Sequence, residues 1–166
     1  MKKKVCLVGD FSVGKTSLTQ QYVKQAFSEK YLTTVGVKID TKEMVVDGKE
    51  LKMVIWDVAG RDALSPLNAN YLIGAAGFLL VIDGTRYETV ESAQILVDTV
   101  INKTGDIPFV VLVNKYDLQN RWVFSSDDKK DFKSRGWQVM TSSAKTGENV
   151  ELAFESIAKR MLGSTT

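Results

Sequence analysis

The chain has 166 residues, of which 44% are hydrophobic and 25% are charged, as is usual for one soluble domain. Its formal net charge of +2 gives no electrostatic argument for a nucleic-acid partner. It has no histidine, which excludes His-based catalytic triads and His-ligated metals. The single cysteine, Cys6, allows no internal disulfide and favours a reducing compartment. No apolar run is long enough to span a bilayer.

The first half of the chain predicts three strands and two helical segments. Residues 5–8 form a short apolar run that predicts a buried strand, and the amphipathic helix after it carries Leu18, Tyr22, Val23 and Ala26 on one face. Residues 25–36 are polar and poorly periodic, so we expect a loop. Two strands, 37–46 and 50–56, should form a hairpin around Asp47-Gly48. A short helical segment is expected at residues 68–75.

The second half alternates strands with helices. The expected strands are residues 77–83, 109–113 and 137–141, and the expected helices are 87–103, 125–135 and a last one that begins near Gly147. Such alternation implies right-handed crossovers and a mainly parallel sheet. We therefore predict an α/β fold in which a six-stranded, mostly parallel sheet with one antiparallel strand has helices on both faces. Residues 1–166 should form one domain.

A phosphate-binding pattern lies between the first strand and the first helix. Gly9, Gly14, Lys15 and Thr16 fit G-x-x-x-x-G-K-[ST]. The glycines permit a backbone whose N–H groups point into one concavity, and the helix N-terminus adds positive potential. Lys15 can then bind the β- and γ-phosphates, while the Thr16 hydroxyl can bind Mg²⁺. The alternative is a flexible glycine and serine loop, but the flanking strand and helix favour a P-loop NTPase domain.

Three further motifs follow later strands, so all four should meet at one edge of the sheet, where α/β proteins bind ligands. They are residues 57–60, 114–117 and 142–145. Asp57 can hold Mg²⁺, directly or through water, and the Gly60 N–H can approach a γ-phosphate. Taken alone, Asp57 would more often be a residue that caps the next helix or turn, and Gly60 could be a plain turn glycine.

The motif at residues 114–117 predicts the base. The Asp117 carboxylate can accept two N–H bonds from the edge of guanine, whereas adenine offers no such donor pair. Asn114 and the Lys115 stem would support the loop and the ring. The Ala144 N–H could reach the guanine O6, and the Lys145 stem could pack on the ring. Taken alone, Asn-Lys-x-Asp is also compatible with an ordinary polar loop.

With these motifs in this order, the whole chain resembles small GTPases of the Ras superfamily, most of all its Ras and Rab branches. The resemblance implies that Phe27 packs against guanine, that Thr34 reaches Mg²⁺ and the γ-phosphate, and that Tyr31 closes over the phosphates. Residues 28–37 and 58–72 would be the two switches. The alternatives are a core aromatic for Phe27 and a loop threonine for Thr34.

The resemblance completes the expected site and its ligands, which are GTP or GDP and Mg²⁺. The residues expected to contact nucleotide are Gly9, Asp10, Phe11, Ser12, Val13, Gly14, Lys15, Thr16, Ser17, Phe27, Tyr31, Thr34, Gly60, Asn114, Lys115, Asp117, Leu118, Ser143, Ala144 and Lys145. The metal ligands would be Thr16, Thr34 and Asp57, and the catalytic residues Lys15, Thr34, Gly60 and Arg61.

Partners are expected at the switches. Effectors, exchange factors and GTPase-activating proteins would bind residues 28–39 and 56–72, and we expect a monomer that binds no nucleic acid. Ile39, Trp56 and Tyr71 would form an apolar surface read by partners, unless all three belong to the core. The chain ends without a cysteine to prenylate. We therefore expect a cytoplasmic protein that meets membranes only through partners or a missing tail.

Two departures from the family concern hydrolysis. The family usually has Gln where this chain has Arg61, and Gly or Ser where it has Phe11. Gln can accept a bond from the attacking water, whereas Arg can only donate. We therefore expect a GTP-binding molecular switch in signalling or trafficking with slow hydrolysis. The alternatives are a pseudo-GTPase scaffold with negligible hydrolysis and, less favoured because of Asp117, an ATPase. A competing role for Arg61 is that of a built-in arginine finger.

Overall fold

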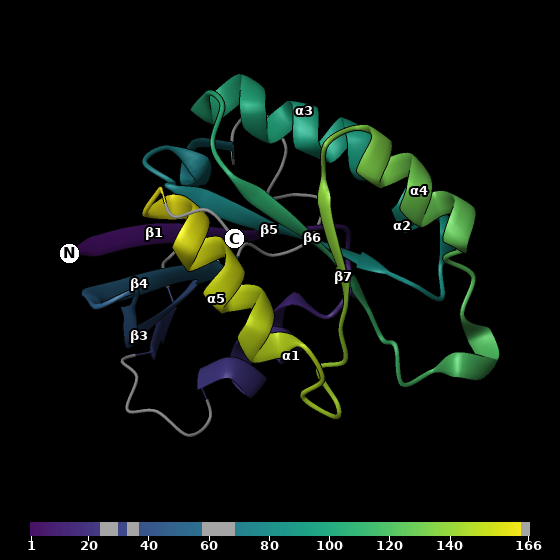
Figure 1. The fold of residues 1–166 in the computed structure, drawn as a ribbon, viewed down its shortest axis with the longest axis horizontal. Helices are drawn as coiled ribbons and strands as arrows, with labels where there is room; N and C mark the ends of the chain where they lie inside the picture. The colour runs from purple at the N-terminus through teal and green to yellow at the C-terminus, as the bar shows by residue number, and fades with distance from the viewer. Residues whose placement is uncertain (24–29, 33–36, 58–68, 164–166) are drawn as a thin grey trace.

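The computed structural model describes residues 1–23, 30–32, 37–57 and 69–163. Within them, one seven-stranded sheet has the order β2-β3-β4-β1-β5-β6-β7 (Figure 1). The strands are β1 (Lys2–Val8), β2 (Lys30–Leu32), β3 (Lys38–Val46), β4 (Lys49–Asp57), β5 (Gly77–Asp83), β6 (Phe109–Asn114) and β7 (Gln138–Thr141). The predicted fold class is confirmed, and β2 adds one strand to the six that were expected.

The β3 strand is the antiparallel one. It runs against β4 on one side and β2 on the other, whereas β4, β1, β5, β6 and β7 pair in parallel. The prediction of a loop over 25–36 was wrong at β2, because this three-residue strand depends on pairing with β3 and has too few residues for a periodic pattern. The hairpin turn was predicted correctly: Asp47 and Gly48 both have positive φ, as a two-residue turn requires.

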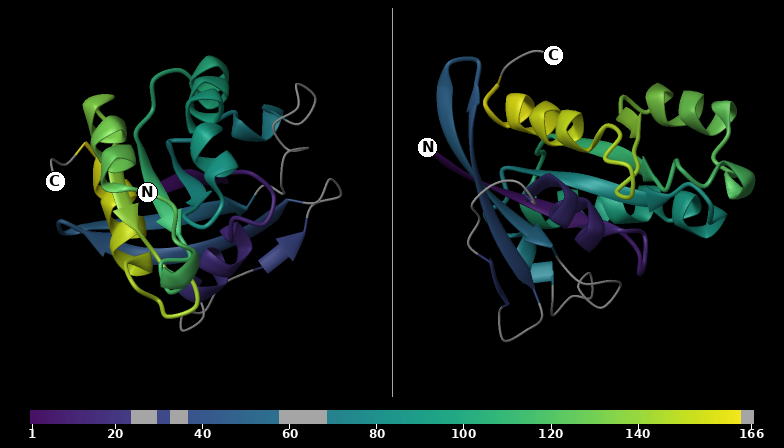
Figure 2. Two further views of the ribbon diagram at one scale, coloured as in Figure 1. Left: turned by 90° about the vertical axis from the view of Figure 1, so that its right-hand side faces the viewer. Right: turned by 90° about the horizontal axis from the view of Figure 1, so that it is seen from below.

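Helices cover both faces of the sheet (Figure 1). One face packs against α1 (Lys15–Val23) and α5 (Val150–Met161), and the other against α2 (Tyr87–Glu91), α3 (Ala93–Thr104) and α4 (Ser126–Ser134). The expected helix over 87–103 is thus divided at Ser92. Two 3₁₀ turns complete the described elements, η2 (Ala69–Leu72) and η3 (Gln119–Arg121). Figure 2 shows the β3–β4 hairpin extending past the helices, beside the N-terminus.

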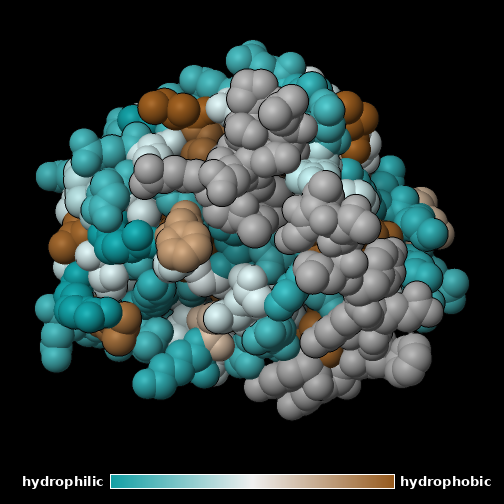
Figure 3. Space-filling model, turned by 180° about the vertical axis from the view of Figure 1, so that it is seen from behind, coloured by the Kyte–Doolittle hydropathy of each residue, from teal (hydrophilic) through white to brown (hydrophobic). Residues whose placement is uncertain are grey.

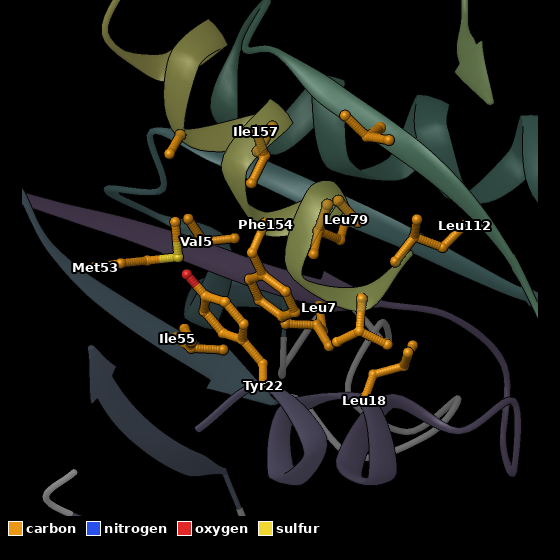
Figure 4. Close-up of a cluster of buried hydrophobic side chains, with 14 of the residues drawn as sticks. Val5, Leu7, Leu18, Tyr22, Met53, Ile55, Leu79, Leu112, Phe154 and Ile157 are labelled. Carbon is orange, nitrogen blue, oxygen red and sulfur yellow. The ribbon is translucent and has the colours of Figure 1, made fainter. Parts of the chain in front are cut away.

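Side chains of the central strands alternate between two cores, as the period of a strand requires. Val5 and Leu7 of β1 pack toward α1 and α5, while Cys6 and Val8 pack toward α2, α3 and α4. In the first core the rings of Tyr22 and Phe154 are stacked with centroids 3.9 Å apart (Figure 4). This contact fixes α1, and with it the loop that precedes α1, against the sheet and α5.

The face of the molecule drawn in Figure 3 is mainly polar where it is coloured. On the coloured part of the face in Figure 3, hydrophilic residues predominate and hydrophobic ones are scattered. Among the described residues, no helix is both long enough and apolar enough to cross a membrane.

Asp83, the last residue of β5, is a charged side chain inside the fold, with no exposed surface. Its carboxylate accepts bonds from Thr85 N (2.8 Å) and Thr85 Oγ1 (2.6 Å), and from Arg86 Nε (3.0 Å) and Lys115 Nζ (2.8 Å). Burial alone would raise the pKa of this carboxyl, but the bonds from Lys115, Thr85 and Arg86 outweigh burial and lower the pKa to about 2. The ionised form of Asp83 therefore stabilises the folded state.

We predict that Asp83→Asn destabilises the protein more at pH 6 than at pH 3. The pKa of about 2 in the folded state lies below the ordinary value of 3.8, so the unfolded chain is protonated first as the pH falls. The stabilisation is full above about pH 5 and is lost as the pH falls toward about 2. Denaturant unfolding should show a free-energy difference between wild type and variant that is about 1 kcal/mol smaller at pH 3.

The matched control is Asp106→Asn, at an exposed position between α3 and β6. We expect its effect on the free energy of unfolding to be small at both pH values. An effect of Asp83→Asn that stays constant from pH 6 to pH 3 would contradict the assignment.

Candidate functional site

The loop between β1 and α1 has a backbone that only glycine allows at two positions. A Cβ on Gly9 would lie 2.4 Å from the Val81 carbonyl oxygen of β5. Gly14 has φ of +104°, and a Cβ there would lie 2.3 Å from Asn114 Nδ2. The loop can therefore approach β5 and β6 so closely only because these residues lack side chains. Between them, Ser12 adopts a positive φ of 61°.

Lys15 lies at the start of α1, and its side chain is held inside the loop. Its Nζ donates to the carbonyl oxygens of Gly9 (2.9 Å) and Asp10 (3.1 Å), and the residue is only 6% exposed. Burial lowers the pKa of Lys15, while the nearby charges of Asp57 and Asp10 oppose this shift. The N-terminal N–H groups of a helix lack intrahelical partners. In α1, the Leu18 N–H donates to the Gly14 carbonyl of the loop (2.9 Å). The loop thus combines a buried cation with the N–H groups of a helix N-terminus.

Thr16 and Asp57 meet at the same place. The Thr16 hydroxyl donates a short hydrogen bond to Asp57 Oδ2, and Asp57, at the end of β4, is 5% exposed. A hydroxyl and a carboxylate are hard oxygen ligands that suit Mg²⁺, which usually takes few protein ligands and keeps water or phosphate oxygens. Among the described residues, no group of three or more acidic, Cys or His side chains could hold a metal by itself. The pair therefore fits a magnesium ion shared with a phosphate ligand.

Asn114, at the end of β6, joins two of the predicted motifs. Its Nδ2 donates to the Val13 carbonyl (2.9 Å), and its Oδ1 accepts from Ser142 Oγ (3.2 Å) and Ala144 N (3.3 Å). The residue is 1% exposed, so its amide bonds form away from water. Asn114 thus fixes the phosphate loop and the loop after β7 relative to each other. The Ala144 N–H, expected to reach guanine, bonds Asn114 in this structure.

Lys115 and Asp117 extend this connection. Lys115 Nζ donates to the Ser12 carbonyl (2.9 Å) and contacts Asp83 Oδ2 (2.8 Å). Asp117 Oδ1 accepts a bond from Ser143 Oγ (2.7 Å), and the Tyr116 N–H donates to the Ser142 carbonyl (3.0 Å). The Ser143 hydroxyl leaves the second Asp117 carboxylate oxygen for another donor. Of the side chains in this region, that of Lys145 is exposed.

An open pocket of about 600 Å³ lies beside these residues. It is lined by Gly14, Ser17, Gln20, Gln21, Asn114, Lys115, Asp117, Leu118, Ala144 and Lys145. Gln20 and Gln21 were not among the residues expected from the sequence. Their spacing could have identified them, because they follow Ser17 by three and four residues and so lie on the same face of the helix. Asp83 was not expected either, although, like Asp57, it is an aspartate at the end of a buried strand.

Several expected site residues lie outside the described part of the chain. They are Phe27, Thr34, Gly60 and Arg61, together with the side chain of Tyr31. Phe11 is described and 70% exposed. The structure therefore brings together the phosphate-loop, Asp57 and residue 114–118 parts of the predicted site, with Ser143 and Ala144 beside them.

Comparison with known proteins identifies relatives of this fold and site. The sequence profile of the Ras family matches residues 4–163. The Ras-related protein Rab7 of Drosophila melanogaster is 39% identical over 165 residues, which cover 96% of this chain and 80% of the relative. The Ras-related protein Rab-7a of Dictyostelium discoideum is 37% identical over 166 residues, which cover 96% and 82%. This chain is a GTPase that belongs to the Ras family and is similar to its Rab members.

Proposed function

We propose that the chain binds GTP and GDP together with Mg²⁺ at the site around the phosphate loop, and cycles slowly between these states as a molecular switch in signalling or trafficking. The observation that carries this proposal is the Asn114 amide, which holds the phosphate loop and the base loop at one edge of the sheet. A cytoplasmic location, with membrane contact through partners or a lipid tail, belongs to the same proposal.

At the phosphate end, each described side chain has a defined role. Lys15 would exchange its bonds to the Gly9 and Asp10 carbonyls for bonds to the β- and γ-phosphates, since a buried ammonium needs acceptors. Thr16 and Asp57 would separate to hold Mg²⁺, which neutralises charge on the phosphate oxygens. We propose Thr34 as a further ligand and the Gly60 N–H as a γ-phosphate contact. Because these two would sense only GTP, they would distinguish the switch states.

At the base end, Asp117 would select guanine. Ser143 holds one carboxylate oxygen of Asp117 at 2.7 Å, so the carboxylate is oriented before a base arrives. Two N–H groups of guanine would donate to the carboxylate, whereas adenine would leave it unpaired. Phe27, Lys115 and Lys145 would then cover the ring. The open pocket beside Asp117 provides the space for a base.

We predict that Asp117→Asn exchanges the base preference. The wild type should bind GTP roughly 10⁴-fold more tightly than ATP, since a site with buried polar partners rejects an analogue that lacks them. The variant should lose about 100-fold in GTP affinity and prefer xanthosine triphosphate, because xanthine has an oxygen that needs a donor. Competition against fluorescent GDP measures both effects. Asp127→Asn, in the first turn of α4, is the control, and equal competition by ATP and GTP against wild type would contradict the assignment.

Arg61 bears on the rate of hydrolysis, because the resemblance to the Ras superfamily leads us to expect Gln at this position, which lies outside the described residues. Hydrolysis needs a water in line with the γ-phosphorus, and a guanidinium cannot accept a bond from that water. We propose intrinsic hydrolysis of roughly 10⁻⁴ s⁻¹ or less. The exposed Phe11 ring would hinder an arginine brought by a partner, so acceleration would need a partner that also positions water. The second candidate function is a scaffold that binds nucleotide without hydrolysis.

We predict that Arg61→Gln accelerates single-turnover GTP hydrolysis by on the order of tenfold or more, because Gln can both accept from water and donate to phosphate. Arg121→Gln, at an exposed position in η3, controls for loss of a positive charge and should hydrolyse at the wild-type rate. If Arg61 instead acts as an internal arginine finger, Arg61→Gln will be slower at unchanged GTP affinity. That result would overturn this part of the proposal.

The surface beside the switches is partly formed by described residues. Ile39 lies opposite Trp56 in the β3–β4 pair, and Tyr71 of η2 packs against them. Ile39 is only 5% exposed, which favours the alternative that it belongs to the core. Trp56 and Tyr71 are half-buried. Lys4 Nζ lies 3.7 Å from the centroid of a Trp56 ring and donates to the Tyr71 carbonyl. We propose that partners read Trp56 and Tyr71 through residues 28–39 and 56–72.

We predict that Trp56→Ala weakens capture of partners by GTP-analogue-loaded protein, by about 2 kcal/mol or more in binding free energy if Trp56 is an interface anchor. Its affinity for GTP should stay at the wild-type value, because Trp56 is not among the residues that line the pocket beside Asp117. Ile95→Ala, at a 69% exposed position on α3, is the matched control. Unchanged capture by Trp56→Ala, or its global unfolding, would favour a purely structural role.

A further inference from the structure

Arg86, just before α2, connects the end of β5 to the phosphate loop. Its guanidinium donates through Nε to Asp83 Oδ2 (3.0 Å) and through Nη2 to the Phe11 carbonyl (2.7 Å). These two acceptors lie far apart in the chain, at positions 83 and 11, which are 72 residues apart. One planar side chain therefore joins a buried carboxylate to a loop peptide, a use that suits the rigid fork of Arg.

Lys115 repeats this arrangement one residue further along the loop. Its Nζ contacts the same Asp83 oxygen (2.8 Å) and donates to the Ser12 carbonyl (2.9 Å). Asn114 Nδ2 then donates to the Val13 carbonyl (2.9 Å). Three consecutive loop carbonyls, those of Phe11, Ser12 and Val13, thus each accept a bond from a side chain outside the loop. Arg86 supplies the first of the three.

These bonds determine where the loop N–H groups point. In a planar trans peptide the C=O and the following N–H lie on opposite sides. Donors that hold the three carbonyls therefore direct the N–H groups of Ser12, Val13 and Gly14 to the other side of the loop. A donor on a carbonyl also polarises its peptide, which makes the attached N–H a stronger donor. Such N–H groups are the ones that a phosphate loop uses to bind its ligand.

We propose that Arg86 is a positioning residue that orients and polarises the Phe11–Ser12 peptide toward the phosphates of a bound guanine nucleotide. This inference rests on the proposed nucleotide site and adds to it a residue outside the four motifs. Asp83 serves as the anchor for Arg86 and Lys115 together. Its low pKa, about 2, keeps the carboxylate ionised at neutral pH, so both cations retain their anchor while they act on the loop.

Arg86 differs from a residue of an ordinary surface ion pair, because its guanidinium bonds a buried carboxylate and a loop carbonyl. Arg86 also approaches Glu88, but at 3.9 Å and with a glutamate side chain that is 65% exposed, so that contact contributes little. Arg135 provides a comparison, because its side chain has the same 35% exposure and pairs with Asp131 at 2.6 Å. Arg135 bonds Gln94 of α3 and not the phosphate loop. It is therefore a matched control for charge, exposure and ion pairing.

The test measures release of fluorescent methylanthraniloyl-GDP, and of the corresponding non-hydrolysable GTP analogue, from wild type, Arg86→Ala, Arg86→Lys and Arg135→Ala. We expect Arg86→Ala to release nucleotide about tenfold faster than wild type, and Arg135→Ala to release it at the wild-type rate. Phosphorus NMR of bound GDP should show a shifted phosphate resonance in Arg86→Ala and an unshifted one in Arg135→Ala. A thermal melt of each GDP complex measures the structural cost of both substitutions.

Each outcome bears on the proposal. Wild-type release rates and an unshifted resonance in Arg86→Ala would overturn it, whatever the melting temperature, because an ion pair that only stabilises the fold predicts that result. If Arg86→Ala does not fold, Arg86→Lys decides: release faster than wild type supports the proposal, and release at the wild-type rate overturns it. Failure of the wild type to bind GDP or GTP would instead refute the proposed function on which this inference depends.

Discussion

The site depends on the amide of Asn114, which is buried between the phosphate loop and the loop after β7 and hydrogen-bonds both of them. Its nitrogen holds Val13 of the phosphate loop, and its oxygen holds Ser142 and Ala144 beyond β7. Since these bonds form at a residue that is 1% exposed, leaving one group unpaired would cost the desolvation of that group. The close approach also explains Gly14, where any Cβ would collide with the same amide. A buried side chain thereby fixes the relative position of the two loops that the proposed nucleotide site requires.

Around that amide, three cationic side chains each donate hydrogen bonds to backbone carbonyls of the phosphate loop. Lys15 bonds the Gly9 and Asp10 carbonyls, Lys115 bonds Ser12, and Arg86 bonds Phe11. The buried Asp83 carboxylate anchors two of these cations. Lys15 differs from the others because it bonds two backbone carbonyls and is buried, which lowers its pKa. It is therefore the cation best placed to exchange its carbonyl partners for a phosphate, while Lys115 and Arg86 keep the loop in shape.

Sequence reasoning succeeded where a local pattern determines the structure. The run at residues 5–8 with its following loop, the Asp47-Gly48 turn and the alternating strands each carry a short-range signal, and the structure has the strand, the turn and the fold class they predicted. It failed at β2, whose three residues pair with β3 only through tertiary structure. It also failed to single out Asp83 and Arg86, because neither belongs to a motif. Their importance comes from contacts with Lys115 and Phe11, which are distant in sequence.

We propose that this edge of the sheet holds a guanine nucleotide. The most direct measurement is to purify the protein without added nucleotide, denature it, and identify the released small molecules by ion-pair chromatography and mass spectrometry. We expect GDP or GTP at close to one molecule per chain, together with magnesium in the intact sample, since a buried Lys15 and a preorganised Asp117 should retain the ligand through purification. Recovery of adenine nucleotides in its place, or of an empty protein that takes up no GDP when it is supplied with Mg²⁺, would contradict it.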